Sequence, residues 1–142
     1  MRGMAPRRLA AIVFAVLLTI GPAVAATQPT REAQVDQLLG EMNRVRAEHH
    51  LTPLKVDQQL MRAAQRHTED MARNNRLDHL GSDGSKLADR AKRAGYDYAR
   101  VAENLAAGYA TAAQAVKSWL DSPPHRRNLL DPEISDAGIG YV

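Results

Sequence analysis

The spacing of apolar residues predicts three long helices. Over residues 31–50 the apolar positions follow i, i+3, i+4, i+7 and i+10, which is one face of a helix: Val35, Leu38, Leu39, Met42 and Val45. Asp57 can cap a second helix that runs to about Asn75. The buried face of this helix is expected to be Leu60, Ala64, His67 and Met71. Thr111 can cap a third helix, whose buried side is expected to be Ala115, Val116, Trp119 and Leu120.

Turn-forming residues divide the rest of the chain into shorter elements. A short helix is predicted over residues 85–94, with Gly95 placed to end it. Residues 101–106 and 137–142 favour strands. Pro123-Pro124 are expected to end the third long helix and to hold His125 in a rigid turn. This order, mostly helix with a little late strand, indicates the α+β class.

The first 25 residues have the layout of a secretory signal peptide. Residues 1–8 contain three arginines and no acid, and residues 9–20 form an apolar stretch of twelve. Small residues precede a cleavage position expected after Ala25. A transmembrane helix needs about 20 apolar residues, so this stretch is short for one. We therefore expect a secreted protein with no stable membrane anchor, in which residues 26–34 form a short leader and residues 35–142 one domain.

Removal of the signal changes the charge. The 142 residues include 19 basic and 16 acidic ones, and the signal takes three basic residues and no acidic ones. The remaining 117 residues are formally neutral, which gives no support for nucleic-acid binding. The chain has no cysteine, and this excludes a disulfide-stapled scaffold and a lipoprotein anchor.

Three of the five histidines are expected to be structural. His49 and His50 lie at the predicted end of the first helix, where the helix dipole favours cations. His67 lies on the apolar face of the second helix, where a lone histidine is usually a hydrogen-bonded core residue.

The other two histidines are candidates for a site. His79 and His125 each follow or precede turn residues, and loops are where binding and catalytic groups are often placed. Glu103 lies between them in sequence, in a short apolar strand where a carboxylate needs a partner. The three residues could bind a divalent metal or act as an acid–base set, although intervals of 24 and 22 residues match no local metal motif.

Four ordered segments carry a resemblance to a known family: LGEMNRVRAEHHLTPLKVDQQLMRAAQRHTEDMA, DHLGSDGSKLADRAKRAGY, VAENLAAGY and VKSWLDSPPHRRNLLDPEISDAGIGY. In this order they resemble the bacterial branch of the CAP superfamily, which is named for cysteine-rich secretory proteins, antigen 5 and plant pathogenesis-related proteins. The resemblance covers about residues 38–141. It implies an α-β-α sandwich, with helices on both faces of a small antiparallel sheet.

The resemblance also implies a site. His79, Glu103 and His125 would converge in a central cleft, with Ser122 and Asn104 as neighbours. In eukaryotic relatives such a cleft holds two histidines and two acids and can bind a divalent ion such as zinc. Ser122 takes the position of the second acid here, which removes one anionic ligand and leaves His79, His125 and Glu103 as candidate metal ligands.

A second departure concerns the final strand. Family members usually continue past the GIGY segment into a last strand, whereas only Val142 follows Tyr141 here. The sheet is therefore expected to lack that strand and to expose an edge that a protein partner could complete.

Three functions are compatible with the sequence. The leading one is a secreted, non-enzymatic module that binds a lipid-like or cell-envelope ligand or a divalent ion, because no Gly-x-Ser-x-Gly or His-Glu-x-x-His motif is present. The second is a hydrolase, such as a protease, in which Ser122 and His125 act with Glu103. The third is an interaction module with a vestigial cleft.

Overall fold

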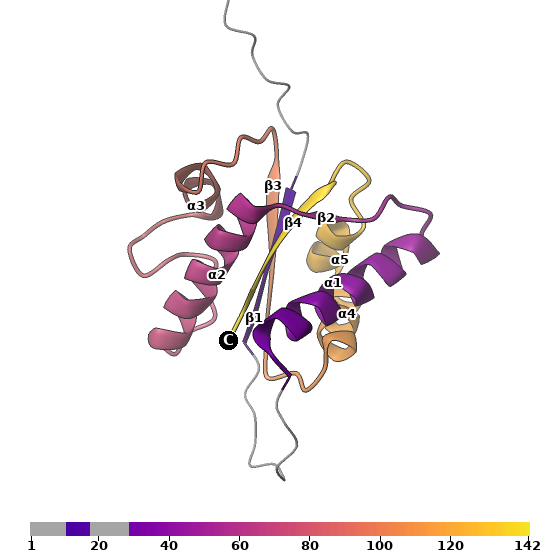
Figure 1. Ribbon diagram of the computed structural model, residues 1–142, viewed down its shortest axis with the longest axis horizontal. Helices are drawn as coiled ribbons and strands as arrows, with labels where there is room; N and C mark the ends of the chain where they lie inside the picture. The colour runs from indigo at the N-terminus through magenta and orange to yellow at the C-terminus, as the bar shows by residue number, and fades with distance from the viewer. Residues whose placement is uncertain (1–10, 18–28) are drawn as a thin grey trace, which may run out of the picture.

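A four-stranded sheet lies between two groups of helices in the part of the chain that the computed structural model describes, residues 11–17 and 29–142. The strands are β1 (Ala11–Leu17), β2 (Lys55–Val56), β3 (Val101–Ala107) and β4 (Asp136–Tyr141). The helices are α1 (Arg31–Glu48), α2 (Gln58–Arg73), α3 (Leu87–Arg93), α4 (Ala112–Asp121) and α5 (Pro123–Leu129). Helices α2 and α3 lie on one side of the sheet, and α1, α4 and α5 lie on the other (Figure 1). This arrangement confirms the predicted α+β sandwich.

The long helices begin at the predicted caps. Asp57 accepts hydrogen bonds from the amides of Gln59 and Leu60, and Thr111 accepts one from Gln114. Thr30 caps α1 in the same way, so the last four residues of the expected 26–34 leader are helical. The residues predicted to face the core from α2 are all buried: Leu60, Ala64, His67 and Met71.

Arg46 is a buried residue that the apolar pattern did not mark. Its side chain is 0 % exposed and donates to four carbonyl oxygens, those of Thr52, Leu129, Asp131 and Ile134. These bonds attach the C-terminal end of α5 and the following turn to α1. Burial lowers the pKa of Arg46 from its ordinary value, and the nearby charge of Asp131 acts in the opposite direction.

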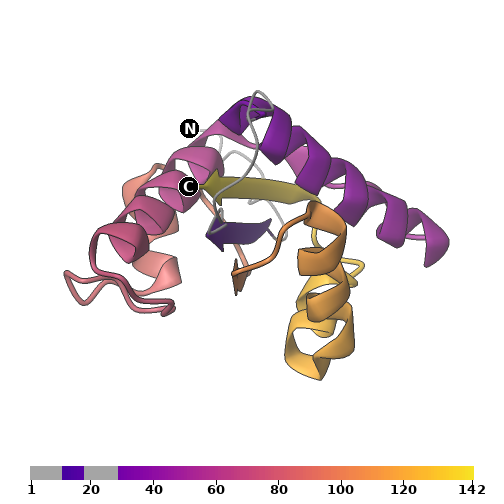
Figure 2. The same ribbon diagram turned by 90° about the horizontal axis from the view of Figure 1, so that it is seen from below.

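The strand pairings differ from the expected antiparallel sheet. The order is β2-β4-β1-β3, and every pairing among the described strands is parallel. The arrows of β4 and β1 point in the same direction in Figure 2. Helices intervene between β2 and β3 and between β3 and β4, and such crossovers allow successive strands to run in the same direction. β1 lies between β4 and β3, so residues 11–17, which the sequence assigns to a signal peptide, form an inner strand of the sheet in this structure.

The signal peptide lies largely outside the described residues. Residues 1–10 and 18–28 include the cleavage position after Ala25, so cleavage remains a prediction. A chain that begins at Ala26 would lack β1. Among residues 11–17 and 29–142, no helix is long and apolar enough to cross a membrane.

Two glycines in β4 allow α2 to lie against the sheet. A Cβ atom added to Gly138 would collide with the backbone of Leu60, and one added to Gly140 would collide with Ala64 and Thr68. Glycine is required where two backbones approach this closely.

Side chains bond to a few backbone groups near the two edges of the sheet. Beyond the short β2, Gln65 bonds to the amide and carbonyl of Tyr141 in β4 at 3.0 and 3.2 Å. Along β3, the carbonyl of Glu103 accepts from Asn128 at 3.3 Å, and that of Leu105 accepts from Trp119 at 2.9 Å. These contacts occupy some of the backbone groups that another strand could use, and the strand-completing partner stays a prediction.

The prediction of a rigid turn after Trp119 was wrong, because a helix follows there. Pro123 and Pro124 do follow the end of α4, but they also begin α5. Proline suits the first positions of a helix, because the amide it lacks would have no intrahelical acceptor there. His125 is therefore a helical residue in the first turn of α5 rather than a residue of a rigid loop.

Candidate functional site

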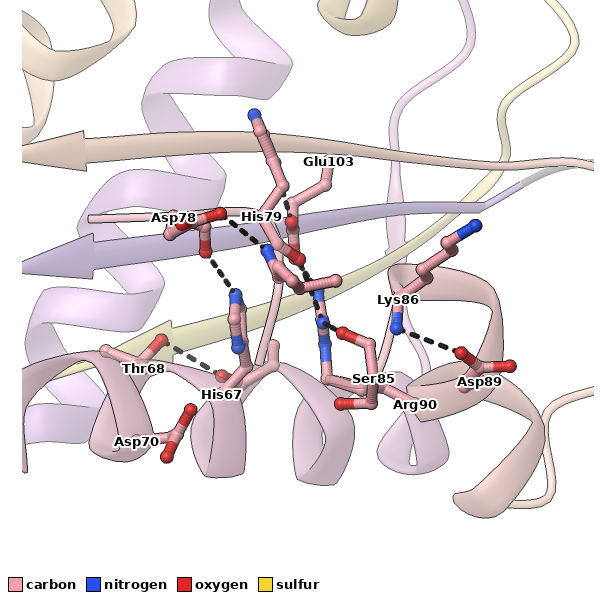
Figure 3. Close-up of polar contacts among 12 residues, drawn as sticks. His67, Thr68, Asp70, Asp78, His79, Ser85, Lys86, Asp89, Arg90 and Glu103 are labelled. Carbon is pink, nitrogen blue, oxygen red and sulfur yellow. Dashed lines mark hydrogen bonds and ion pairs between the residues drawn. The ribbon is translucent and has the colours of Figure 1, made fainter. Parts of the chain in front are cut away.

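The carboxylate of Glu103 is the centre of the site. Its side chain is 2 % exposed, and both of its oxygens are bonded. Oε2 accepts from His79 Nδ1 at 2.8 Å, and Oε1 accepts from an Arg90 terminal nitrogen at 2.9 Å (Figure 3). A buried carboxylate needs a partner, and Glu103 has two, a histidine and a guanidinium.

Arg90 is the site residue that sequence reasoning missed. Its other terminal nitrogen donates to the carbonyls of His79 and Ser85 at 3.0 and 2.9 Å. It therefore holds the Glu103 side chain and the His79 backbone at the same time (Figure 3). Helical spacing could have indicated its burial. Leu87, Arg90 and Ala91 are at positions i, i+3 and i+4 of α3 and so share its inner face.

The loop that carries His79 is fixed on both sides of the histidine. His67 Nε2 bonds to the carbonyl of Asp78 at 2.9 Å, and the Asp78 carboxylate accepts from the amide of Leu80 at 2.8 Å. Because a carbonyl only accepts, His67 Nε2 carries a proton. The prediction that His67 is a hydrogen-bonded core residue is confirmed, although its Nδ1 has no partner in the described part of the chain. Burial lowers the pKa of His67.

His79 presents its other nitrogen to solvent. Its side chain is 60 % exposed, and Nδ1 must donate to the carboxylate because a carboxylate only accepts. The hydrogen bond to Glu103 raises the pKa of His79, while partial burial acts against this rise. Nε2 makes no hydrogen bond within residues 11–17 and 29–142, so it is free to meet a ligand.

An open groove of about 520 Å³ runs past His79. Its apolar wall is formed by Leu80, Leu87, Val101 and Ala102. Its polar side chains are Asp78, His79, Lys86, Glu103 and Asn128. Leu80 is 42 % exposed although it lies beside this buried charge network. The groove thus has both apolar and polar lining residues, and among the polar ones His79 and Glu103 are held by a mutual hydrogen bond.

His125 lies near this network without bonding to His79 or Glu103. Its Nδ1 is 3.0 Å from Ser122 Oγ, and its carbonyl accepts from Asn104 at 3.0 Å. Asn128, one turn later, bonds to Asn104 Oδ1 at 2.9 Å and so ties α5 to β3. Partial burial lowers the pKa of His125, and the charge on His79 lowers it further.

The predicted site residues are therefore only partly brought together. His79 and Glu103 are in direct contact, whereas His125 is paired with Ser122. Within the described ranges no group of three or more His, Asp or Glu side chains is arranged to hold a metal ion. A zinc site usually has three or more protein ligands, and the Arg90 cation on Glu103 would repel a metal ion. These residues do not fit a divalent ion well.

Comparisons with known proteins agree with the fold. The sequence profile of the cysteine-rich secretory protein family, CAP, matches residues 39–142. Two Bacillus subtilis proteins, the uncharacterized protein YkwD and the uncharacterized membrane protein YlbC, are each 35% identical to this chain, over 100 and 104 residues. The matches cover 70% and 73% of this chain but 39% and 30% of the relatives. This chain thus spans less than half the length of either relative.

Two solved structures are similar. An extracellular protein containing an SCP domain from Bacillus anthracis has a TM-score of 0.73 at 29% identity, covering 82% of this chain and 42% of that one. An outer surface protein from Borrelia burgdorferi has a TM-score of 0.59 at 18% identity, covering 76% of this chain and 79% of that one. At this identity the second likeness concerns the fold alone.

Proposed function

Because the chain belongs to the cysteine-rich secretory protein family, CAP, we propose that it is an extracellular, non-enzymatic binding module for an amphipathic, lipid-like ligand of the cell envelope. The observation that carries the proposal is the groove beside His79, which is lined both by apolar side chains and by hydrogen-bonded polar ones. The expected export signal and the extracellular location of the Bacillus anthracis SCP-domain protein support the assignment to the outside of the cell.

The two kinds of lining residue suit two parts of one ligand. Leu80, Leu87 and Val101 offer apolar surface for a hydrocarbon chain. The exposed Nε2 of His79 is held in place through Nδ1, so it can hydrogen-bond a polar head group without losing further freedom. When His79 is protonated, the same nitrogen would favour an anionic head group.

A dansyl-labelled fatty acid tests this proposal by fluorescence titration of the purified chain. Full burial of a leucine contributes about 1.5–3 kcal/mol, and the ligand can cover only the 42 % of Leu80 that is exposed, so Leu80→Ser is expected to weaken binding by about three- to tenfold. Val56→Ser is the matched control, because Val56 is 40% exposed and does not line the groove. Equal affinities for the wild type and Leu80→Ser would contradict the proposal.

Metal binding is not included in this function. With Glu103 bonded to both His79 and Arg90, the groove lacks the ligand set that zinc prefers. Thermal unfolding with chelator and then with zinc should give the same midpoint. A rise with zinc that disappears in His79→Ala would restore the metal hypothesis.

A hydrolase remains the second candidate because Ser122 and His125 are hydrogen-bonded at 3.0 Å. A serine nucleophile needs a base that is itself oriented by a third group. Glu103, the expected third member, bonds to His79 instead. Hydrolysis of a p-nitrophenyl ester by the wild type, lost in Ser122→Ala and retained in Ser118→Ala, would favour this second function over the first.

A further inference from the structure

A second cavity has Arg90 in its lining and shares no lining residue with the groove. It has a volume of about 280 Å³ and is enclosed by α2, α3 and the loop between them. A single water needs only about 15 Å³ of such space, so the cavity can hold a small ligand. Its lining includes four guanidinium groups, those of Arg66, Arg73, Arg90 and Arg93. Neither the family resemblance nor the proposed function involves this cavity.

The two carboxylates in the cavity wall, Asp70 and Asp83, already accept hydrogen bonds from neighbouring protein groups. Asp70 accepts from the amide and hydroxyl of Ser82 at 2.8 and 2.5 Å, and these bonds lower its pKa. Asp83 accepts from the amide of Ser85 at 2.9 Å and from Arg93 at 2.6 Å, and its pKa is also lowered. Both acids are thus fixed as part of the loop, and they neutralise two of the four positive charges that line the cavity.

Two of the arginines have no ion-pair partner in the ranges the structure describes. Arg66 and Arg73 are seven residues apart on α2, two helical turns, and so project from the same face. Arg73 influences the pKa of Asp70 through its charge but is not hydrogen-bonded to it. Arg90 directs its terminal nitrogens at Glu103, His79 and Ser85, so its charge is paired with Glu103 and it offers no free donor to the cavity.

We propose that this cavity binds a phosphate group, held by Arg66 and Arg73 with Arg93 at the rim. Arginine presents a planar set of donors that matches the oxygens of phosphate, and charge-assisted bonds of this kind are the strong ones. Because Asp70 and Asp83 bond to Ser82, Ser85 and Arg93, they leave Arg66 and Arg73 without a hydrogen-bonded acid, and the small residues Ala63 and Ala94 leave room for the group. The phosphate can be free or can be the end of a small phosphorylated molecule.

Calorimetric titration of the purified chain with inorganic phosphate at constant ionic strength tests this site. We expect saturable binding that the double variant Arg66→Gln/Arg73→Gln weakens roughly tenfold or more, since two charge-assisted contacts are lost. The control double variant Arg62→Gln/Arg127→Gln removes the same charge from exposed positions outside the cavity and should retain wild-type affinity. All four arginines are exposed, so both variants should keep the wild-type urea midpoint.

A comparison of ligands distinguishes free phosphate from a phosphorylated small molecule, and the wild-type titration can overturn the proposal. Tighter binding of glycerol phosphate than of inorganic phosphate would identify a phosphorylated small molecule as the ligand, and equal affinities would identify free phosphate. Absence of saturable binding by the wild type, or equal weakening in both double variants, would overturn the proposal. The fatty-acid titration of the groove uses different residues, so the two results are independent.

Discussion

His79 and Glu103 are 24 residues apart in the sequence, and their Nδ1 and Oε2 atoms lie 2.8 Å apart. The carboxylate is buried, whereas the imidazole is mostly exposed. The protonated imidazole therefore gains a charge-assisted hydrogen bond while its other nitrogen stays accessible. This relationship raises the pKa of His79 above its ordinary value.

NMR titration of the His79 ring should detect this rise. In the wild type the midpoint should lie above about 6.5, the ordinary value for histidine, and Glu103→Gln should lower it because the anionic partner is gone. The control Glu48→Gln removes an exposed carboxylate of α1 and should leave the midpoint unchanged.

The same pair sets a pH dependence of stability. Because the pKa of His79 is raised on folding, its contribution is fully present below about pH 6.5 and is lost as the pH rises through the folded value. His67 and His125 act in the opposite direction, since their lowered pKa values make folding less favourable as the pH falls. If the NMR midpoint of His79 is identical in the wild type and Glu103→Gln, the hydrogen bond does not raise the pKa of His79 and cannot cause this pH dependence.

Arg90→Met should strongly destabilise the fold. The substitution leaves Glu103 buried with a single partner and releases the carbonyls of His79 and Ser85. Loss of one member of a buried ion pair costs about 3–5 kcal/mol, so we expect a decrease of that order in the free energy of unfolding, measured with urea. Lys92→Met, an exposed position on the same helix, should change it by less than about 0.5 kcal/mol. Similar midpoints for the two variants would mean that the ion pair contributes little.

Arg46→Met should be destabilising by about 3 kcal/mol or more, because four carbonyl oxygens lose their common donor. Arg44 on the same helix forms only exposed ion pairs with Glu41 and Glu48. Arg44→Met should therefore cost no more than about 1 kcal/mol. Urea unfolding of both variants gives the comparison, and an equal cost would refute the role assigned to Arg46.

Glycine substitutions should have opposite effects at two positions. Gly138→Ala places a methyl group into the backbone of α2 and should cost about 1–3 kcal/mol or prevent folding. Gly40→Ala meets no atom within 4 Å and lies in the interior of α1, where alanine is favoured by about 0.5–1 kcal/mol. Thermal unfolding should thus show a lower midpoint for the first and a higher one for the second. Destabilisation by Gly40→Ala would indicate an unrecognised contact.

The elements with strong local signals could be predicted from the sequence. Helix α2 followed from its apolar period and from Asp57, and the need of Glu103 for a partner followed from its apolar strand. These signals depend on residues close together in the chain. The prolines were ambiguous because Pro123 can end one helix and begin another, and the structure shows both.

The remaining contacts carry no local signal. Arg46 donates to carbonyls more than eighty positions away, and nothing near it in sequence indicates that an arginine is buried there. The parallel pairing of β1 with β3 and β4 was missed because residues 11–17 have the composition of an export signal. Composition does not reveal whether an apolar segment pairs with a sheet.

The position of β1 has a consequence for the order of folding. Ala11 is in register with both Val101 and Asp136, so this inner strand precedes both of its neighbours in the chain by about ninety residues or more. Pairings this distant form slowly, because a long loop must close first. During synthesis the seven apolar residues are therefore exposed until nearly the whole chain has left the ribosome. An export machinery that acts during synthesis would therefore reach residues 11–17 before their partner strands do.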